Sequence, residues 1–443
     1  MPRIAFIGAG SVGFTRQLFR DILSVPALTD TTFAFHDISE NNLKMVAQLC
    51  DKDSTASGLN TSIETYTNRQ EALIGADYII NCTRIGGLEA FTHDIEIPLK
   101  YGVDQCVGDT ICAGGIMYAQ RNVPAILDFC ADISELANPN ALFLNYANPM
   151  AINTWAAIEH GFTNTVGLCH GVQNTHAQIA TALGASSKSE VEVQAAGINH
   201  QTWFIRILYR GQEVSCRDLL EAFEKHPELS VREKVRIDVL RRFGYYSTES
   251  NGHLSEYLPW YRKRPEELSS WIDRSSWING ETGGYLEHCK KLRDSFDTSF
   301  EEEMLSDAKV ITPETRTDEH ASHIIEALET GHTYRGHFNV QNNGVIPNLP
   351  SDCIVEVPGY VDRTGINIQR LDPLPDACAA TCNASISVQR MALKAALTGD
   401  KTLLKQAMLH DPLVGAVCTP QEVWNMTDEM LVAQSKWLPQ YTK

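Results

Sequence analysis

One short stretch near the N-terminus constrains this chain more than any other. An apolar, β-branched run, residues 3–7, leads directly into the turn Gly8-Ala9-Gly10-Ser11-Val12-Gly13. A segment with apolar residues at helical spacing follows, and a second strand-like run, residues 32–36, ends at Asp37. Strand, G-x-G-x-x-G turn, helix, strand and acidic residue in this order are typical of a dinucleotide-binding unit.

Each part of this pattern has a physical reason. Gly8 permits the tight turn, Gly10 lets the backbone approach a pyrophosphate, and Gly13 lets the helix pack close to the strand. The helix N-terminus then faces the phosphates with unpaired N–H groups. Asp37 is expected to accept hydrogen bonds from ribose hydroxyls, which favours NAD over NADP because a 2′-phosphate would be repelled. The residues predicted to bind NAD are Gly8, Gly10, Ser11, Gly13, Asp37 and Asn81.

Further strand-like runs extend the same sheet. Residues 76–82 and 142–146 each follow a helix-like segment, so residues 1–195 are expected to form a Rossmann-type, doubly wound α/β domain with a parallel sheet. Residues 196–443 mix strands (201–208 and 353–357) with helical patterns (318–330 and 385–398). We predict an α+β domain there that binds substrate and metal and mediates oligomerisation, with an approximate boundary.

Composition excludes several classes of protein. The formal net charge is −18, which lacks the basic footprint that binding to nucleic acid requires. No apolar run reaches the ~18–20 residues that span a bilayer. The twelve cysteines form no C-x-x-C pair, and no signal or transit segment precedes the first strand. We therefore expect reduced thiols and a cytoplasmic enzyme that binds neither nucleic acid nor membrane.

Candidate functional groups follow the predicted strands, where ligands bind in open α/β sheets. They lie in Arg84-Ile85-Gly86-Gly87, Asn148-Pro149-Met150 and Cys169-His170-Gly171. Cys169 and His200 are 31 residues apart, each on a turn after a predicted strand. A lone cysteine is more often a small buried apolar residue, and a lone histidine is more often a satisfied polar one. From the residues alone, a metal pair and a structural pair both remain open.

Four motifs together resemble family 4 of the glycoside hydrolases, the NAD- and metal-dependent α-glycosidases, and three later motifs resemble its α-galactosidase branch. The four are residues 8–11, 148–150, 167–170 and 196–200, and the later three are residues 243–250, 343–350 and 437–439. The resemblance implies a homodimer or homotetramer and a metal pair formed by Cys169 and His200. It also implies Mn²⁺, although a thiolate alone would favour softer ions.

The resemblance also implies an unusual mechanism. NAD⁺ takes a hydride from carbon 3 of the sugar, and the resulting ketone acidifies the proton on carbon 2. A base removes that proton while the metal stabilises the enediolate, the aglycone is eliminated from carbon 1, water adds, and the hydride returns. His170 is the candidate general acid. Tyr245, Tyr246, Glu249 and Tyr257 compete for the role of base, and Asp109 is a further catalytic candidate that assists the metal or the substrate.

The predicted substrate contacts are Asn148, Arg84, Arg121 and Asn199. Arg84 departs from the α-galactosidase pattern, which has Gln there. Relatives that act on phosphorylated sugars carry a second Arg where this chain has Phe91. Because a phosphate needs several cationic or N–H partners, the single Arg favours an unphosphorylated α-glycoside or oligosaccharide. The order of expectation is α-galactoside, then α-glucoside, with uronic-acid and 6-phospho sugars behind.

Two other classes of function remain as alternatives. An NAD-dependent dehydrogenase of the lactate or malate type shares the opening fold but would need a catalytic His–Asp pair and no Cys169. An NAD sensor without catalysis would bind the dinucleotide and hydrolyse no α-glycoside. The cysteine–histidine pair argues against both.

Overall fold

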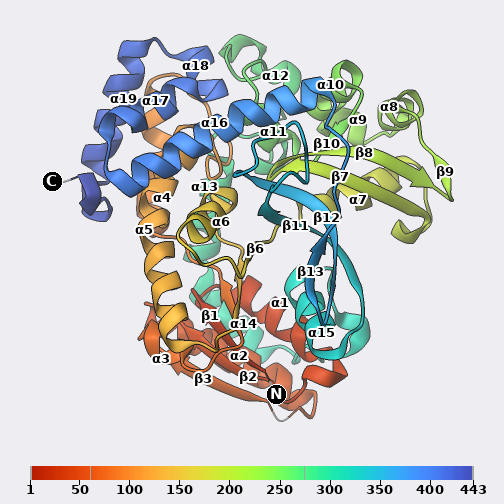
Figure 1. Cartoon of the computed structure of the whole chain (residues 1–443), viewed down its shortest axis with the longest axis vertical. Coiled ribbons are helices and arrows are strands. Elements are labelled where there is room, and N and C mark those ends of the chain that lie inside the picture. Colours follow the sequence, from red (N-terminus) through yellow and green to blue (C-terminus); the bar gives the residue numbers. More distant parts are fainter. Residues whose placement is uncertain (1, 60, 274, 442–443) are drawn as a thin grey trace.

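A mixed β-sheet connects the two halves of the chain in the structure, a computed structural model that describes residues 2–59, 61–273 and 275–441 (Figure 1). Its strands are β1 (Arg3–Ile7), β2 (Thr32–His36), β3 (Ser62–Tyr66), β4 (Tyr78–Asn81), β5 (Leu142–Asn145), β6 (Thr165–Gly167), β7 (Val191–Ile198), β8 (Gln201–Tyr209), β9 (Gln212–Glu213), β10 (Tyr246–Ser247), β11 (Tyr334–Gln341), β12 (Ile354–Asp362) and β13 (Gly365–Ile368). Their order is β10-β8-β7-β12-β11-β6-β5-β4-β1-β2-β3, with β13 paired to β12 and β9 to β8.

Helices cover this sheet and extend beyond it. They are α1 (Val12–Leu23), α2 (Glu40–Ala56), α3 (Arg69–Leu73), α4 (Gly87–Lys100), α5 (Cys112–Leu136), α6 (Met150–Glu159), α7 (Gly171–Ala182), α8 (Cys216–Lys225), α9 (Leu229–Arg232), α10 (Lys234–Phe243), α11 (Asn251–Tyr257), α12 (Leu268–Trp271), α13 (Gly284–Asp294), α14 (Phe296–Leu305), α15 (His320–Thr330), α16 (Asp376–Thr398), α17 (Lys401–His410), α18 (Pro412–Val417) and α19 (Pro420–Ala433). Among the described residues, none of these helices is long and apolar enough to cross a bilayer.

The parallel half of the sheet confirms the predicted doubly wound α/β fold. Six strands pair in parallel in the order β3-β2-β1-β4-β5-β6. The chain adds β2 and β3 on one side of β1 and then returns to add β4, β5 and β6 on the other side. This is the order that places ligands beyond the carboxyl ends of β1 and β4. The central strands are buried on both faces, which explains their nearly continuous apolar sequences.

The antiparallel half joins the same sheet rather than forming a detached domain. Asn339 of β11 pairs with Gly167 of β6, and Glu356 of β12 pairs with Gly197 of β7. The predicted boundary at residue 195 falls inside β7. One hydrophobic cluster contains Phe6 and Phe33 from the N-terminal half together with Ile324 and Phe338 from the C-terminal half. The carboxyl end of β6 and the turn between β7 and β8 are thereby held in one rigid framework.

Candidate active site

The glycine turn after β1 is tight at Gly8, as predicted, and at Gly10 it lies close to Asp37. Gly8 has a φ of +88°, and a Cβ there would lie 3.0 Å from the backbone of Cys82 and Thr83. The N–H of Gly10 donates to Asp37 Oδ2 at 2.7 Å, and a Cβ on Gly10 would come equally close to that oxygen. The turn and the acidic residue therefore form one unit.

The explanation for Gly13 is wrong. A Cβ built on Gly13 meets nothing within 4 Å, so close packing between helix and strand does not require this glycine. Gly13 instead lines a cavity of about 740 Å³ together with Gly10 and Ser11. Ser11 makes no side-chain cap for α1, which leaves the first N–H groups of the helix available to a ligand in that cavity.

The opposite wall of this cavity comes from α13 and α14, which supply Arg293 and Phe296. An ion pair of 2.8 Å between Arg16 and Glu303 holds α14 against α1. A dinucleotide fits this arrangement, because the cavity contains an uncapped helix N-terminus and is lined by Gly10, whose N–H bonds to the Asp37 carboxylate.

Asn81 is predicted to bind NAD, but it does not line this cavity. It is fully buried, its amide nitrogen donates to Asn145 Oδ1 at 2.9 Å, and its Oδ1 accepts from the N–H and hydroxyl of Thr83. Asn81 thus positions the ends of β4 and β5, and its own amide is occupied within the protein.

Three side chains converge as a candidate metal site. Cys169 follows β6, His200 lies in the two-residue turn between β7 and β8, and Glu249 follows β10. One ligand atom from each lies within 4.8 Å of the others. Cys169 Sγ is 3.7 Å and His200 Nε2 is 3.9 Å from Glu249 Oε1. Thiolate, imidazole and carboxylate together suit a divalent transition metal and leave coordination positions open for substrate oxygens.

A chain of hydrogen bonds orients His200. The Thr110 hydroxyl donates to Asp109 Oδ1 at 3.0 Å, so its oxygen accepts from His200 Nδ1 at 2.8 Å. In this arrangement Nδ1 is the donor, and Nε2, on the side of Glu249, is the nitrogen available to a metal. The left-handed backbone of His200, with a φ of +64°, turns the ring toward this site.

Burial and neighbouring charges shift the pKa values of Glu249, Cys169 and His253 in different directions. Burial alone would raise the pKa of Glu249, but the electrostatic influence of the surrounding His200, His253 and His170 outweighs burial and lowers it. Burial, reinforced by Glu249 and Glu356, raises the pKa of the Cys169 thiol well above its usual value. Burial lowers the pKa of His253 to about 4, which keeps that ring neutral. Loading the site with a cation therefore displaces a proton from Cys169.

His170 stands at the edge of the candidate metal site. Its side chain is 55% exposed, and Nδ1 lies 3.3 Å from Glu319 Oε1. The contact with Glu319 raises the pKa of His170 despite partial desolvation, so the protonated ring is favoured. An exposed, carboxylate-paired imidazolium is a suitable proton donor.

Arg84, Asp109 and Asn148 form a polar group beside His200. Asn148 Nδ2 donates to Asp109 Oδ2 at 3.0 Å, and an Arg84 nitrogen lies 3.9 Å from the same oxygen. The Arg84 guanidinium lies over the rings of Phe91, at 4.6 Å, and Tyr118, at 5.4 Å. These three residues are thus gathered as predicted, and each retains hydrogen-bonding capacity for a sugar hydroxyl.

Two predicted site residues have structural roles instead. Arg121 is buried and pairs through both terminal nitrogens with Asp94 at 3.0 and 2.6 Å, so it offers no contact to substrate. The hydroxyl of Tyr246 donates to Gln178, and its ring stacks on Phe223 in a hydrophobic cluster. Tyr246 is therefore removed from the candidates for the base.

Two of the remaining candidates, Tyr257 and Asn199, lie beside His200. Tyr257 is buried, and its hydroxyl is 3.3 Å from His200 Nδ1. Burial raises the pKa of Tyr257, with Glu256 and Asp109 adding to the effect. Asn199 is also buried, and neither amide atom has a hydrogen-bond partner in the described part of the chain. Tyr245 belongs to the aromatic rim of the larger hydrophobic cluster.

Sequence reasoning missed Thr110, His253 and Glu319, which complete this arrangement. Thr110 and Glu319 approach from loops far apart in the chain, and no local spacing marks them. His253 has one local signal, because it stands four residues after Glu249 at the start of α11.

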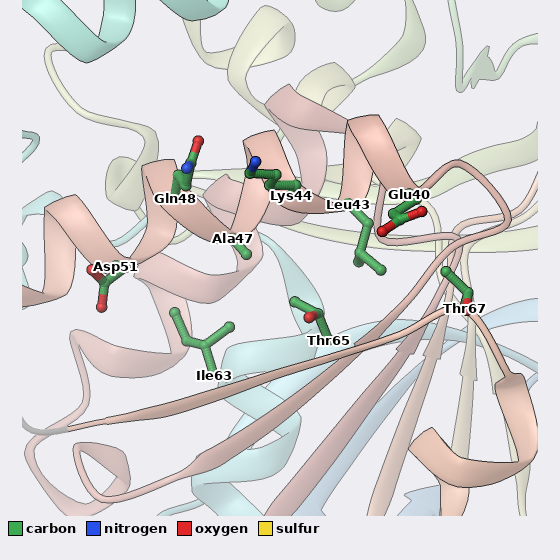
Figure 2. Close-up of a pocket in the computed structure, with 9 residues that line it drawn as sticks. All are labelled: Glu40, Leu43, Lys44, Ala47, Gln48, Asp51, Ile63, Thr65 and Thr67. Atoms are coloured by element: carbon green, nitrogen blue, oxygen red, sulfur yellow. The ribbon is translucent and has the colours of Figure 1, made fainter.

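A second hollow lies on the outer edge of the N-terminal half, between α2 and β3 (Figure 2). It measures about 530 Å³ and carries Lys44, Gln48 and Asp51 on its helical wall. None of the predicted catalytic or cofactor residues lines it, so it is separate from the candidate active site.

Comparison with known proteins identifies the family of this chain. Residues 3–185 match the family description "Family 4 glycosyl hydrolase", and residues 195–414 match "Family 4 glycosyl hydrolase C-terminal domain". The chain is 62% identical to an α-galactosidase of Rhizobium meliloti (strain 1021) over 439 residues, covering 99% of this chain and 89% of that one. An α-galacturonidase of Lachnoclostridium phytofermentans is 27% identical, covering 99% and 97% of the two chains.

Solved structures share this fold. A Bacillus subtilis protein described as glucosidase lplD has a TM-score of 0.85 at 25% identity, covering 97% of this chain and all of that one. A 6-phospho-β-glucosidase of Thermotoga maritima, solved with manganese, NAD⁺ and glucose-6-phosphate, has a TM-score of 0.80 at 22% identity, covering 98% and 99%. The fold and the matches define a glycosidase built on a Rossmann-type sheet. The chain belongs to family 4 of the glycosyl hydrolases.

Proposed function

We propose that this protein is an α-galactosidase that uses NAD and a divalent metal, Mn²⁺ by analogy with its relatives. The observation that carries the substrate is the 62% identity with an α-galactosidase over nearly the whole chain. The relatives solved with NAD and manganese support the two cofactors. Family membership favours glycoside hydrolysis over a lactate- or malate-type dehydrogenase or a sensor.

The residues present fit both groups. The turn of Gly8, Gly10 and Ser11 with Asp37 would hold NAD, and Cys169, His200 and Glu249 would hold the metal. When bound, NAD supplies a recyclable hydride acceptor, and the metal supplies a Lewis acid for the oxygens of sugar carbons 2 and 3. Glu249 thereby becomes a ligand rather than a base, because it faces both Cys169 and His200.

The chain's other residues divide the remaining work. Asp109, Asn148 and Arg84 orient the sugar hydroxyls beside His200. His170, held protonated by Glu319, donates a proton to the departing oxygen. We assign the role of base to Tyr257, because its hydroxyl lies 3.3 Å from His200 Nδ1. Burial raises its pKa, so this role requires a bound cation to lower that pKa. The neutral polar group around Asn148 favours a sugar without phosphate.

Compartment and assembly belong to the same proposal. The cysteines of the described residues are all free, which fits the reducing cytoplasm. We take the functional unit to be a homodimer or homotetramer, to be checked by light scattering on the purified protein.

The test is a panel of nitrophenyl α-glycosides with NAD⁺, Mn²⁺ and a thiol reductant, each additive being omitted in turn. We expect hydrolysis of the α-galactoside above all others, lost when NAD⁺ or Mn²⁺ is withheld. Deuterium at carbon 2 of the sugar should slow the reaction or exchange with solvent. Hydrolysis that persists when both NAD⁺ and Mn²⁺ are withheld would refute the proposed chemistry.

A further inference from the structure

A third cavity, distinct from those at the glycine turn and beside α2, opens onto the candidate metal site from the side of α7, α9 and α10. It measures about 470 Å³, and Glu249, His170 and His253 line its inner end. The glycine turn lines a different cavity, formed with α13 and α14. A sugar held at the metal site would thus have this cavity beside it, and this cavity shares no lining residue with the one at the glycine turn.

One wall of this cavity carries polar side chains with unused hydrogen-bonding capacity. Asn174 on α7 is exposed, and its amide bonds to no side chain or backbone group of a described residue. Arg232 at the end of α9 is 41% exposed and bonds through Nε to Glu233, which leaves its terminal nitrogens pointing to no described partner. A planar amide and a guanidinium supply adjacent donors and acceptors that match the neighbouring hydroxyls of a sugar.

The facing wall is apolar and rigid. Trp277 and Ile278 line it, and Ile278 is 42% exposed. The rings of Tyr285 and His288 pack against Trp277 at 5.0 and 5.7 Å, which fixes the indole in place. A packed aromatic ring and polar planar groups that line one cavity suit a ligand with an apolar C–H face and a hydroxyl rim, such as a pyranose.

The charge of the cavity argues for a neutral ligand. Glu233 pairs with both Arg232 and Arg236, at 3.0 Å each, and Glu228 and Glu249 also line the cavity, so three carboxylates balance its two guanidinium groups. A phosphate or carboxylate would need at least two uncompensated cationic partners.

We propose that this cavity binds the leaving-group sugar of an oligosaccharide substrate, with Asn174, Arg232 and Trp277 as its specificity-determining contacts. This inference rests on the proposed function, because the sugar to be cleaved must occupy the metal site. His170 lies between the two sugars in this arrangement, where a proton is needed by the departing oxygen.

The experiment compares two substrates in the NAD⁺- and Mn²⁺-loaded enzyme. One is a disaccharide of α-linked galactose and glucose, and the other is α-galactosyl fluoride, whose leaving group is too small to enter the cavity. Asn174→Ala and Arg232→Ala should each lower kcat/KM for the disaccharide about tenfold, chiefly through KM. The same variants should change kcat/KM for the fluoride by less than about twofold.

The matched control is Arg217→Ala, which removes an arginine that is 88% exposed and lies outside the cavity. It should alter neither substrate. Equal losses for both substrates in the Asn174 and Arg232 variants, or no loss for the disaccharide, would overturn the assignment.

Calorimetric titration with free glucose separates this proposal from the proposed function. If wild-type enzyme hydrolyses neither substrate but binds glucose, and Asn174→Ala abolishes that binding, the sugar site stands and the proposed activity fails. If wild-type enzyme hydrolyses both substrates and the variants keep the wild-type ratio of the two kcat/KM values, the activity stands and the sugar site fails.

Discussion

At the scale of single residues, Glu249 shows how one side chain can be reassigned by its surroundings. Its sequence position suggested a base, whereas its carboxylate lies within 4 Å of both Cys169 Sγ and His200 Nε2, and its pKa is lowered despite burial. A charged carboxylate facing a thiol and an unprotonated imidazole nitrogen is better explained as a metal ligand than as a proton acceptor.

Replacing Glu249 by Gln should therefore weaken Mn²⁺ binding at least about tenfold, because even outer contacts of a metal site cost this much when lost. Titration of free Mn²⁺ by electron paramagnetic resonance measures the change, and NAD affinity should stay constant. Glu319→Gln is the control, since Glu319 contacts His170 and none of the three ligands. Unchanged Mn²⁺ affinity in Glu249→Gln would return this residue to the candidates for the base.

Glu356 carries a separate prediction about stability. It is fully buried in β12, accepts from the Thr202 hydroxyl at 2.5 Å, and burial raises its pKa to about 8. The unfolded chain releases this proton near the ordinary glutamate value, whereas the folded chain holds it to about pH 8. The folded state therefore loses stability as pH rises between these two values.

Glu356→Gln removes that titration, so its stability relative to wild type should rise by several kcal/mol between about pH 5 and pH 9. Urea unfolding of the metal-free protein at both pH values measures the difference. Glu213→Gln, at an exposed strand position, should show no such trend. A difference between Glu356→Gln and wild type that is independent of pH would mean that Glu356 titrates normally in the folded state.

At the scale of elements, local patterns predicted much of the fold. The strands at residues 3–7 and 32–36 match β1 and β2, because an apolar strand followed by a glycine turn and a helix is encoded locally. The fold class and the family were likewise confirmed. The gathering of Cys169 and His200 was expected from resemblance, and their proximity agrees with it.

The predicted roles were wrong for residues whose hydrogen-bond partners lie far away in the sequence. Arg121 could not be recognised as structural, because its partners Asp94 and Gln434 lie 27 and 313 residues away. Tyr246 is occupied by Gln178, which is 68 residues distant. Periodicity and spacing report which face of an element is buried, but they carry no information on which polar side chain from another element meets it.

The glycine turn offers a matched pair of variants at this scale. Gly10→Ala brings a Cβ to 2.7 Å from Asp37 Oδ2, so either the turn or the carboxylate must move. We expect the unliganded protein to lose about 1–3 kcal/mol of stability, with weaker NAD binding. Gly13→Ala meets open space at the start of α1 and should leave the stability unchanged or slightly higher.

Thermal unfolding of the unliganded variants, followed by circular dichroism, measures both effects. NAD titration of the folded proteins then reports the cofactor site. A Gly10→Ala protein as stable as Gly13→Ala would show that the contact between the turn and Asp37 is dispensable.

At the scale of the whole molecule, the continuous sheet is the feature that links the two cofactor sites. The dinucleotide turn follows β1, while His200 and Glu249 follow strands of the antiparallel half. Pairing between β6 and β11 and a shared hydrophobic cluster join these halves (Figure 1). The halves should consequently unfold as one cooperative unit rather than in two steps.

The distribution of tryptophan makes this coupling measurable. Six of the seven tryptophans lie beyond residue 200, and the seventh, Trp155, packs in the hydrophobic cluster that contains the C-terminal helices. A ligand that binds only the folded state at a hundred times its dissociation constant adds about 2.7 kcal/mol of stability. With NAD at that concentration, unfolding followed by tryptophan fluorescence and by far-ultraviolet circular dichroism should shift upward by the same amount. Gly10→Ala, with its damaged turn, should show a smaller shift by both probes. If NAD moved only the circular dichroism transition, the N-terminal half would be unfolding independently, and the shared sheet could not be what holds the dinucleotide and metal sites together.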